Sequence, residues 1–363
     1  MVMKKNSMDA NQKNPLDIIL SEAPNFSAHE AVDMVRENYG LDVTVKELVS
    51  ERDQNFLIST VLGKRYVFKI ANSEEDIEVT DFQIKALTHI QLKKDDSIIT
   101  PEIKNSKLNL DSIQISKDGK VFNARVVTYL DGEPMWSSDN SIPDLYVASD
   151  MGRYLACLGK ALKDFIHPGS NQSLLWDMKQ ALFLREITGH ISDNHSKKMV
   201  NEVLTAFEDY ALPVFDSLRW QVIHNDMNPD NVLIDTKGMR RVCGVIDFGD
   251  MVYSPLIIDI AVAASYLDTD DGNPLYLMNN FIAGYNNVTK LTLDEISILF
   301  DLIKVRLATT VAIAAWRKSF RDSDDPYLVL NSDDTSLKLL ERLIEIPREH
   351  AIQTFRQICA SND

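Results

Sequence analysis

Two short stretches in the second half of the chain carry its strongest pattern, VIHNDMNPDNVLID at 222–235 and VIDFGD at 245–250. Each places polar residues directly beside apolar, strand-like runs. Phosphoryl transfer needs a carboxylate to orient the nucleophile, and oxygen ligands to hold Mg²⁺ on the nucleotide phosphates. Asp226 is the candidate for the first role, and Asn231 and Asp247 are the candidates for the second. The two stretches therefore predict a phosphoryl-transfer site.

Spacing indicates how these residues meet. Residues 231–234 and 242–247 read as two strands, which predicts a hairpin with its turn at 237–238. In that hairpin Asn231 and Asp247 lie opposite each other. Mg²⁺ prefers one or two protein oxygens and completes its shell with water and phosphate. The hairpin therefore predicts a Mg²⁺ site at its open end, next to the loop that carries the catalytic carboxylate.

The motif also has a structural alternative. His-x-Asp-x-x-x-x-Asn alone arises by chance in roughly one such chain in twenty, at about 5% per residue type. In that alternative Asp226 and Asp230 are turn and cap residues, and Asp247 is a buried structural acid. The Asp-Phe-Gly tripeptide lies at the expected distance downstream, in an apolar strand. Its position argues against coincidence and favours the catalytic interpretation.

The first half of the chain has the pattern of a small β-rich unit. Ser27 and Glu30 form a capping box, which predicts a helix that ends at Gly40. Alternation places Lys69 on the face of its strand opposite to Phe68, although a surface lysine on an edge strand is the alternative. A further helix is expected at 76–91, and strands are expected at 42–49, 55–62, 65–71, 112–116 and 121–130.

After residue 131 the pattern changes to mostly helix. Helices are expected at 144–165, 172–190, 195–216 and 293–318. The expected domains are a disordered tail at 1–14, a nucleotide-binding N-lobe at 15–130, and a helical C-lobe at 131–363 with the catalytic loop, metal site and acceptor pocket. The fold class is α+β, and a cleft between two such lobes is the usual place for a ligand.

The composition is that of an acidic globular protein. Among 363 residues, Lys and Arg number 38 and Asp and Glu number 54, so the net charge is −16. Such a surface repels nucleic acids and anionic membranes, and we expect neither as a partner. Three scattered cysteines, Cys157, Cys243 and Cys359, offer no disulfide framework or zinc spacing. With no signal peptide and no apolar run of about 18 residues, the protein is expected to be cytoplasmic.

The motifs resemble those of a known group of enzymes. The loop from His224 to Asn231, together with Asp247, resembles the catalytic and metal-binding loops of the aminoglycoside phosphotransferase and choline kinase group of small-molecule kinases. Within that group, four further motifs resemble the hydroxylysine kinase family. They are SERDQNF at 50–56, DFQ at 81–83, IDFGDM at 246–251 and RLA at 306–308. The likeness runs from about residue 22 to about residue 320.

The resemblance implies a fold and a set of roles. The fold would be protein-kinase-like and two-lobed, with a small β-rich N-lobe and a larger, mostly helical C-lobe. Asp226 would be the catalytic base, and Asn231 and Asp247 would bind Mg²⁺. Lys69 would grip the α- and β-phosphates of ATP or GTP. Two residues of the lobe junction would contact the purine base: Thr128 and Leu130.

The sequence departs from the kinase pattern in two places. No G-x-G-x-x-G precedes Lys69, so Asn55 and neighbouring backbone amides would have to contact the phosphates. The helix position that supplies a glutamate to the lysine in kinases is Gln83 here, which can accept a hydrogen bond from Lys69 but brings no charge. Glu78 or Asp81 could replace it if the helix is rotated, and a further alternative is that Gln83 is only a helix-surface residue.

The resemblance also implies a small hydroxylated acceptor, an amine or an amino acid such as hydroxylysine. Candidates for its pocket are Trp176, Tyr253, Trp316 and Arg317, with core packing as the alternative for the aromatic residues. A cationic acceptor would suit four acidic residues expected near the cleft, Asp250, Asp268, Asp270 and Asp271. Two other functions stay open: a protein-modifying kinase of the same fold, and a nucleotide-binding pseudokinase.

Overall fold

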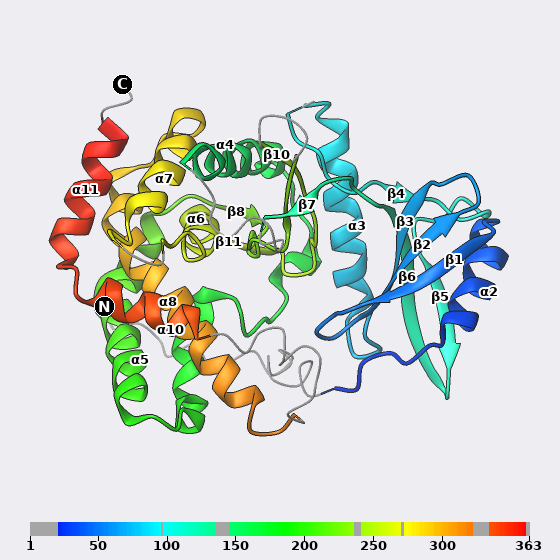
Figure 1. Ribbon diagram of the computed structural model, residues 1–363, viewed down its shortest axis with the longest axis horizontal. Coiled ribbons are helices and arrows are strands. Elements are labelled where there is room, and N and C mark those ends of the chain that lie inside the picture. The colour runs from blue at the N-terminus through cyan, green and yellow to red at the C-terminus, as the bar shows by residue number, and fades with distance from the viewer. Residues whose placement is uncertain are drawn as a thin grey trace.

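A computed structural model of the protein describes residues 21–95, 97–135, 145–235, 241–269, 272–321 and 334–360. A β-sheet with two helices forms one part of the molecule, and a larger helical part lies beside it (Figure 1). The sheet is antiparallel, with the strand order β1-β2-β3-β6-β4, and β5 also pairs with β6. Its strands are β1 (Val43–Leu48), β2 (Gln54–Thr60), β3 (Arg65–Ile70), β4 (Ile103–Lys104), β5 (Ile113–Lys117) and β6 (Lys120–Thr128). The α+β class and the expected strands are confirmed.

Strand β3 lies inside the sheet, between β2 and β6. Phe68 and Ile70 are fully buried in a core that they share with helix α2 (Ala28–Tyr39). Val67 packs against the other core, on the opposite face, and Lys69 alternates with Phe68 to that same face. The edge-strand alternative for Lys69 is wrong, because β3 has a neighbour on each side.

Two helices accompany the sheet. Helix α2 begins at the predicted capping box, in which Glu30 N–H donates to Ser27 Oγ (3.2 Å) and Ser27 N–H donates to the Glu30 carboxylate (2.6 Å). It ends at Gly40, which has the left-handed φ of 69° that glycine adopts without strain. Helix α3 (Ile77–Leu92) lies between the sheet and the helical part (Figure 1). Side chains of α3 therefore border the junction of the two parts.

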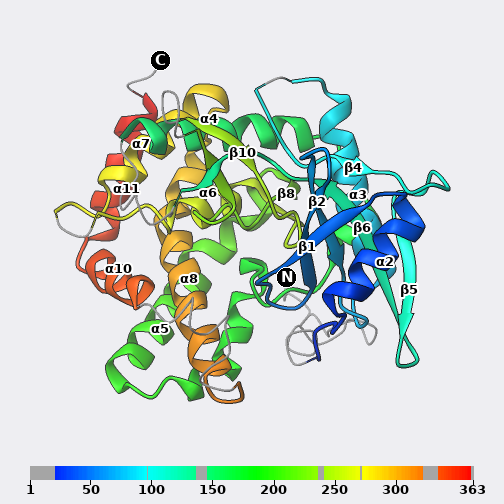
Figure 2. The same ribbon diagram turned by 45° about the vertical axis from the view of Figure 1, so that its right-hand side comes forward.

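The helical part is built around α8, which is buried along most of its 25 residues. Figure 2 shows α8 with α5 and α10 beside it. An apolar sequence on several faces predicts such a buried helix. The helices are α4 (Leu145–Leu162), α5 (Asn194–Ala206), α6 (Leu256–Ala264), α7 (Tyr276–Val288), α8 (Leu293–Arg317), α10 (Thr335–Ile344) and α11 (Arg348–Ala360).

Two of the expected helices are wrong in part. The stretch at 172–190 contains 3₁₀ turns, Met178–Glu186 and Thr188–His190, in which hydrogen bonds close three residues back. The helix expected at 195–216 is α-helical only to the end of α5. A π turn (Phe207–Ala211) and a 3₁₀ turn (Leu212–Ser217) follow, where Pro213 has no N–H to continue the helix.

Short strands hold the motif loops. They are β7 (Glu133–Pro134), β8 (Trp220–Ile223), β9 (Val232–Ile234), β10 (Val242–Val245) and β11 (Val252–Pro255). The hairpin of β9 and β10 is confirmed, but the predicted register is wrong by one residue. Asn231 faces Ile246, whose N–H donates to the Asn231 carbonyl (2.9 Å), and not Asp247. A bulge at Cys243 adds one residue to β10, so Ile234 pairs with Val242 near the turn, whereas Val232 pairs with Val245 at the open end. The expected turn at 237–238 lies outside the described residues.

Helices α4 and α7 pack closely at two glycines. A Cβ on Gly152 would lie 2.0 Å from the Phe281 carbonyl oxygen, and a Cβ on Gly284 would lie 2.0 Å from the Ser149 carbonyl oxygen. Only glycine allows this approach without a backbone shift. Helix α4 also contacts β8 and β10, the strands that lead to the two motif loops.

None of the described helices is long and apolar enough to cross a membrane. The domain boundary expected near residue 130 stays a prediction. The tail expected at 1–14 lies outside the described residues.

Candidate active site

Two neighbouring cavities lie between the sheet and the helical part. The first, of about 280 Å³, is mostly apolar, and Thr128 and Leu130 at the end of β6 contribute to it. The second, of about 550 Å³, is mostly polar and includes Asp226. The cavities are contiguous, because five residues line both: Val49, Asn55, Lys69, Asn231 and Asp247. An apolar space suited to a ring therefore lies beside a charged space suited to phosphates.

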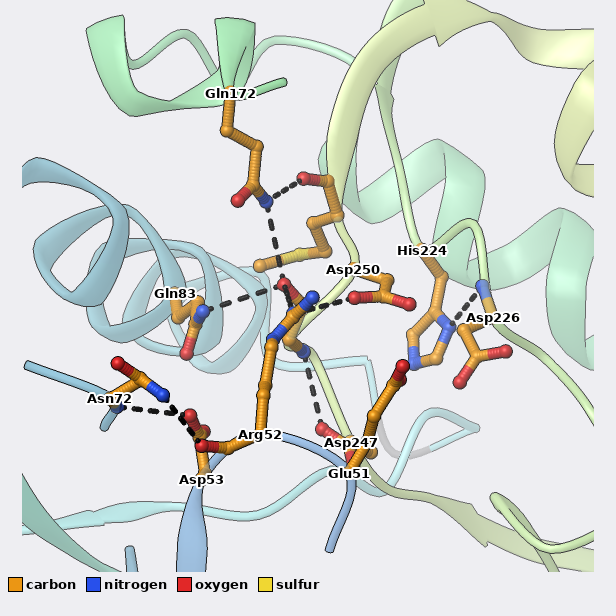
Figure 3. Close-up of polar contacts among 12 residues, drawn as sticks. Glu51, Arg52, Asp53, Asn72, Gln83, Gln172, His224, Asp226, Asp247 and Asp250 are labelled. Carbon is orange, nitrogen blue, oxygen red and sulfur yellow. Dashed lines mark hydrogen bonds and ion pairs between the residues drawn. The ribbon is translucent and has the colours of Figure 1, made fainter. Parts of the chain in front are cut away.

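The loop after β8 is held by a buried carboxylate. Asp259 of α6 accepts hydrogen bonds from the backbone N–H groups of His224 (3.2 Å) and Asn225 (2.8 Å), and burial raises its pKa to about 6. Burial lowers the pKa of His224 to about 4, so its ring is neutral. Nδ1 accepts from the Asp226 N–H (3.3 Å), so Nε2 donates to the Ile246 carbonyl (3.2 Å). His224 therefore connects the two motif loops, and Figure 3 shows its contact with Asp226.

Asp226 is held by side chains on several sides. Its carboxylate accepts hydrogen bonds from the side-chain amides of Asn228 (3.1 Å) and Asn231 (2.7 Å), and Arg306 Nη2 lies 3.4 Å from Oδ1. Burial and the nearby Asp250 carboxylate raise the pKa of Asp226 to about 8, although Arg306 opposes the shift. A carboxyl group whose pKa lies near neutral pH is suited to take up and release a proton.

Asp247 has the opposite electrostatic state. Its φ of 60° is left-handed, and the Gly249 N–H donates to its Oδ1 (3.3 Å). Lys69 Nζ donates to the same oxygen (3.2 Å) and, by its charge, lowers the pKa of Asp247 to about 2. Asp247 is therefore ionised at neutral pH. Among the described residues, no hydrogen bond reaches Asp247 Oδ2 or Asn231 Oδ1, so each side chain has one oxygen available as a metal ligand.

Three side chains converge on one carbonyl in the loop that follows Asp247 (Figure 3). Arg52, Gln83 and Gln172 donate to the Gly249 carbonyl at 3.3, 3.5 and 3.4 Å, from the β1–β2 loop, from α3 and from the helical part. Arg52 also donates to the Asp250 carboxylate (2.6 Å). The loop is thus attached to both parts of the molecule.

The β1–β2 loop covers the polar cavity with charged side chains. Glu51, at the front of Figure 3, forms an ion pair with Arg317 of α8. Asn55 is buried where the loop enters β2, and its Oδ1 has no hydrogen-bond partner within the described ranges. Ion pairs to the helical part therefore position this loop, where kinases have glycines.

Comparison with known proteins places this geometry in a family. Residues 44–290 match the phosphotransferase enzyme family. The chain belongs to that family. Among its relatives is the hydroxylysine kinase of Mus musculus, which is 27% identical over 347 residues that cover 90% of this chain and 91% of the relative. As a member of the phosphotransferase enzyme family, the protein is a small-molecule phosphotransferase that acts on hydroxyl groups.

Solved structures of the family's kinase-like fold match most of the chain. A microcompartment-associated aminopropanol kinase superposes with a TM-score of 0.65 at 14% identity, over 92% of this chain and 98% of that one. An amicoumacin kinase in complex with AMP-PNP, Ca²⁺ and Ami also gives 0.65, at 13% identity, over 90% and 97%. The two-lobed fold expected from the motifs is confirmed.

Lys69 has a different contact from the one expected in this phosphotransferase. Among the described residues, Lys69 Nζ donates to Asp247, and no hydrogen bond joins Lys69 to Gln83. Arg125 lies opposite Lys69 in the register of β3 and β6, and it donates to Gln83 Oε1. Arg125, and not Lys69, is therefore the cation that donates to the amide oxygen of Gln83.

The alternative partners of Lys69 also lie elsewhere. Glu78 is exposed, and Asp81 forms a contact with His167 (3.1 Å). The alternative that Gln83 is a helix-surface residue is wrong as well, because Gln83 is only 2% exposed.

Two of the four acceptor-pocket candidates lie together. The guanidinium carbons of Arg306 and Arg317 lie 4.5 and 5.3 Å from the centroid of the Trp176 ring. Trp316 packs in the hydrophobic core, which was the alternative to a role in the pocket. Tyr253 of β11 packs on a different tryptophan. Sequence reasoning missed Arg306, although the RLA motif that contains it was visible.

The acidic candidates for a cationic acceptor are already paired. Asp250 binds Arg52, and Asp268 binds Arg342 (2.7 Å). The other two, at 270–271, lie outside the described residues. Charge alone therefore does not indicate where an acceptor amine binds.

Proposed function

We propose that the protein is a Mg²⁺-dependent kinase that transfers the γ-phosphoryl group of ATP or GTP to a hydroxyl group of a small amine or amino acid, with hydroxylysine as the first candidate. The observation that carries the proposal is the shared lining of the two cavities. A base in the apolar cavity, beside Thr128 and Leu130, brings the phosphates to Lys69 and the γ-phosphate towards Asp226.

In the proposed step, the acceptor hydroxyl oxygen attacks the γ-phosphorus, and the bond from phosphorus to the β,γ-bridging oxygen breaks. The nucleoside diphosphate leaves, and the hydroxyl proton passes to the Asp226 carboxylate. The amides of Asn228 and Asn231 support this role, since they hold the carboxylate in one orientation. Lys69 and Asn55 line both cavities and would bind the phosphates.

Asn231 and Asp247 fit Mg²⁺ by the chemistry of their free oxygens. One is a carboxylate that stays ionised at neutral pH, and the other is an amide. Mg²⁺ usually binds one or two protein oxygens and keeps water and phosphate as its other ligands. No group of three or more His, Cys, Asp or Glu in the described ranges offers an all-protein site for another metal. When bound, Mg²⁺ would neutralise charge on the phosphates.

The names of the relatives support the acceptor class. Hydroxylysine and aminopropanol both carry an amine and a hydroxyl group. AMP-PNP and Ca²⁺ in the amicoumacin kinase support a nucleoside triphosphate donor with a divalent cation.

The test is a D226N variant assayed with Mg²⁺, ATP or GTP, and a panel of hydroxylated amines and amino acids. Acceptor-dependent release of nucleoside diphosphate should fall by about 1,000-fold, within the usual range for loss of a general base. The affinity for the Mg²⁺-nucleotide, measured by calorimetry, should change little, because Asp226 does not line the apolar cavity proposed for the base and is not among the proposed ligands of the phosphates or Mg²⁺.

Asp235→Asn is the matched control, because it removes one exposed carboxylate just after β9. It should retain transfer. Turnover that survives in Asp226→Asn would refute the role of Asp226. Labelling of a protein substrate, with no turnover of any compound in the panel, would favour a protein-modifying kinase.

A further inference from the structure

Arg306 is a buried cation in contact with the catalytic loop. It projects from α8, and its side chain is only 3% exposed. Its Nη2 donates to the Tyr266 hydroxyl (3.0 Å) and lies 3.4 Å from Asp226 Oδ1. The guanidinium carbon also lies 4.5 Å from the centroid of the Trp176 ring and 5.8 Å from that of the Tyr266 ring. Two aromatic rings therefore hold the guanidinium beside the proposed base.

Most of the donors of this guanidinium are unused. An arginine side chain has five N–H groups, and both polar contacts of Arg306 are made by Nη2. Nε and Nη1 are buried and have no hydrogen-bond partner within the described part of the chain. Asp226 does not serve them, because its contact with Arg306 is made through Nη2.

A buried arginine with unpaired donors is costly unless something compensates it. Arg317 gives the contrast, because it stacks on the same tryptophan but forms an ion pair with Glu51. Among the residues that the structure describes, Arg306 has no such carboxylate of its own beyond the single long contact to Asp226. Its surroundings are those of a site that receives an anion from outside the chain.

Two anions would reach this region in the proposed reaction, the nucleotide phosphates and any anionic group of the acceptor. The phosphates have a separate cation, Lys69 of β3, which contacts Asp247. Arg306 comes from α8, in the other part of the molecule. It contacts Asp226, which would take up the proton of the acceptor hydroxyl. Arg306 therefore lies on the acceptor side.

We propose that Arg306 binds the carboxylate of the acceptor, so that the protein selects hydroxylated amino acids over amino alcohols. This inference rests on the proposed function and deepens it. A carboxylate is the matching group, because charge-assisted bonds from a guanidinium to a carboxylate are stronger than neutral ones. Neither free nitrogen reaches solvent in this conformation, so neighbouring side chains must shift when the acceptor binds.

The experiment compares two pairs of acceptors that differ only in the carboxyl group. The pairs are hydroxylysine with its decarboxylated diamino alcohol, and threonine with its decarboxylated amino alcohol. Binding to the full chain is measured by calorimetry with Mg²⁺ and a non-hydrolysable ATP analogue, and transfer is measured separately with ATP. In at least one pair, the carboxylated acceptor should bind about 10- to 100-fold more tightly, as expected for a charged hydrogen bond.

R306Q should reduce that ratio of affinities to near one, mainly by weakening the binding of the carboxylated acceptor. R306K keeps the charge and should retain part of the preference. Lys304→Gln is the matched control, because it removes a cation from the same helix that pairs with Asp301 instead. It should leave the preference unchanged, and thermal unfolding of each variant verifies that it folds.

Equal binding within both pairs, or a preference that survives in Arg306→Gln, would overturn the inference. Transfer without discrimination would leave the proposed function intact and refute only the role of Arg306. Discrimination in binding without transfer to any acceptor would refute the kinase function and leave the carboxylate site standing.

Discussion

At the scale of single residues, the state of each acid in the site is set by its surroundings. Asp226, Asp247 and Asp259 are all aspartates, yet burial raises the pKa of the first and third, and Lys69 lowers that of the second. Asp259 has no cationic side chain among the causes of its pKa shift, and within the described ranges its carboxylate accepts only from backbone N–H groups of the catalytic loop. It is therefore a sensitive test of this electrostatic account.

We expect Asp259 to make stability depend on pH. Its pKa rises from 3.8 in the unfolded chain to about 6 in the folded protein, so the folded state binds its proton more tightly. The resulting stabilisation is fully present below about pH 4 and is lost as pH rises through about 6. A shift of this size corresponds to about 3 kcal/mol. Urea unfolding between these pH values should show a shallower dependence for Asp259→Asn, whereas parallel curves would contradict the assignment.

At the scale of elements, the contact between α4 and α7 supports the strands of the site. The two helices meet at Gly152 and Gly284, where a Cβ would strike a backbone oxygen at 2.0 Å. Neither glycine lies at a predicted helix end, and nothing in the sequence around them marks a crossing. Helix packing of this kind has to be seen in the structure, because the partner glycine is 132 residues away.

Gly152→Ala should destabilise the protein by about 1–3 kcal/mol or more, because the helices must move apart to accept one methyl group. Gly159→Ala is the matched control in the same helix, where the nearest atom to an added Cβ is a flexible side chain at 3.6 Å. It should be neutral or stabilising by up to about 1 kcal/mol, as alanine is the better helix former. Equal losses of unfolding free energy in the two variants would argue against the crossing.

At the scale of the whole molecule, motif spacing predicted that Asp226, Asn231 and Asp247 share the cleft, because they sit on adjacent strands and loops, and the resemblance to small-molecule kinases implied that Lys69 joins them. Asp226, Asn231, Asp247 and Lys69 are brought together as expected. The sequence does not predict their distant partners. Arg52 reaches Asp250 across 198 residues of chain, and only the packing of the sheet on the helical part determines that contact.

Two local features also escaped prediction, and each has a physical reason. A bulge at Cys243 shifts the pairing by one residue between the two ends of the β9–β10 hairpin, and no residue type there indicates a bulge. The second feature is the hydrogen bond from Arg125 to the amide oxygen of Gln83. It was not predicted, because the sequence does not show that β3 pairs with β6 and so places Arg125 beside Lys69. Both errors left the candidate metal ligands in place.

The central claim is transfer of phosphate to a small-molecule hydroxyl group. The most direct measurement is phosphorus NMR of the products after incubation with Mg²⁺, ATP and hydroxylysine. We expect a phosphate ester on the hydroxyl of the acceptor, formed in a one-to-one ratio with nucleoside diphosphate. Nucleoside diphosphate accompanied only by inorganic phosphate, or phosphate found on protein with none on the acceptor, would contradict the claim.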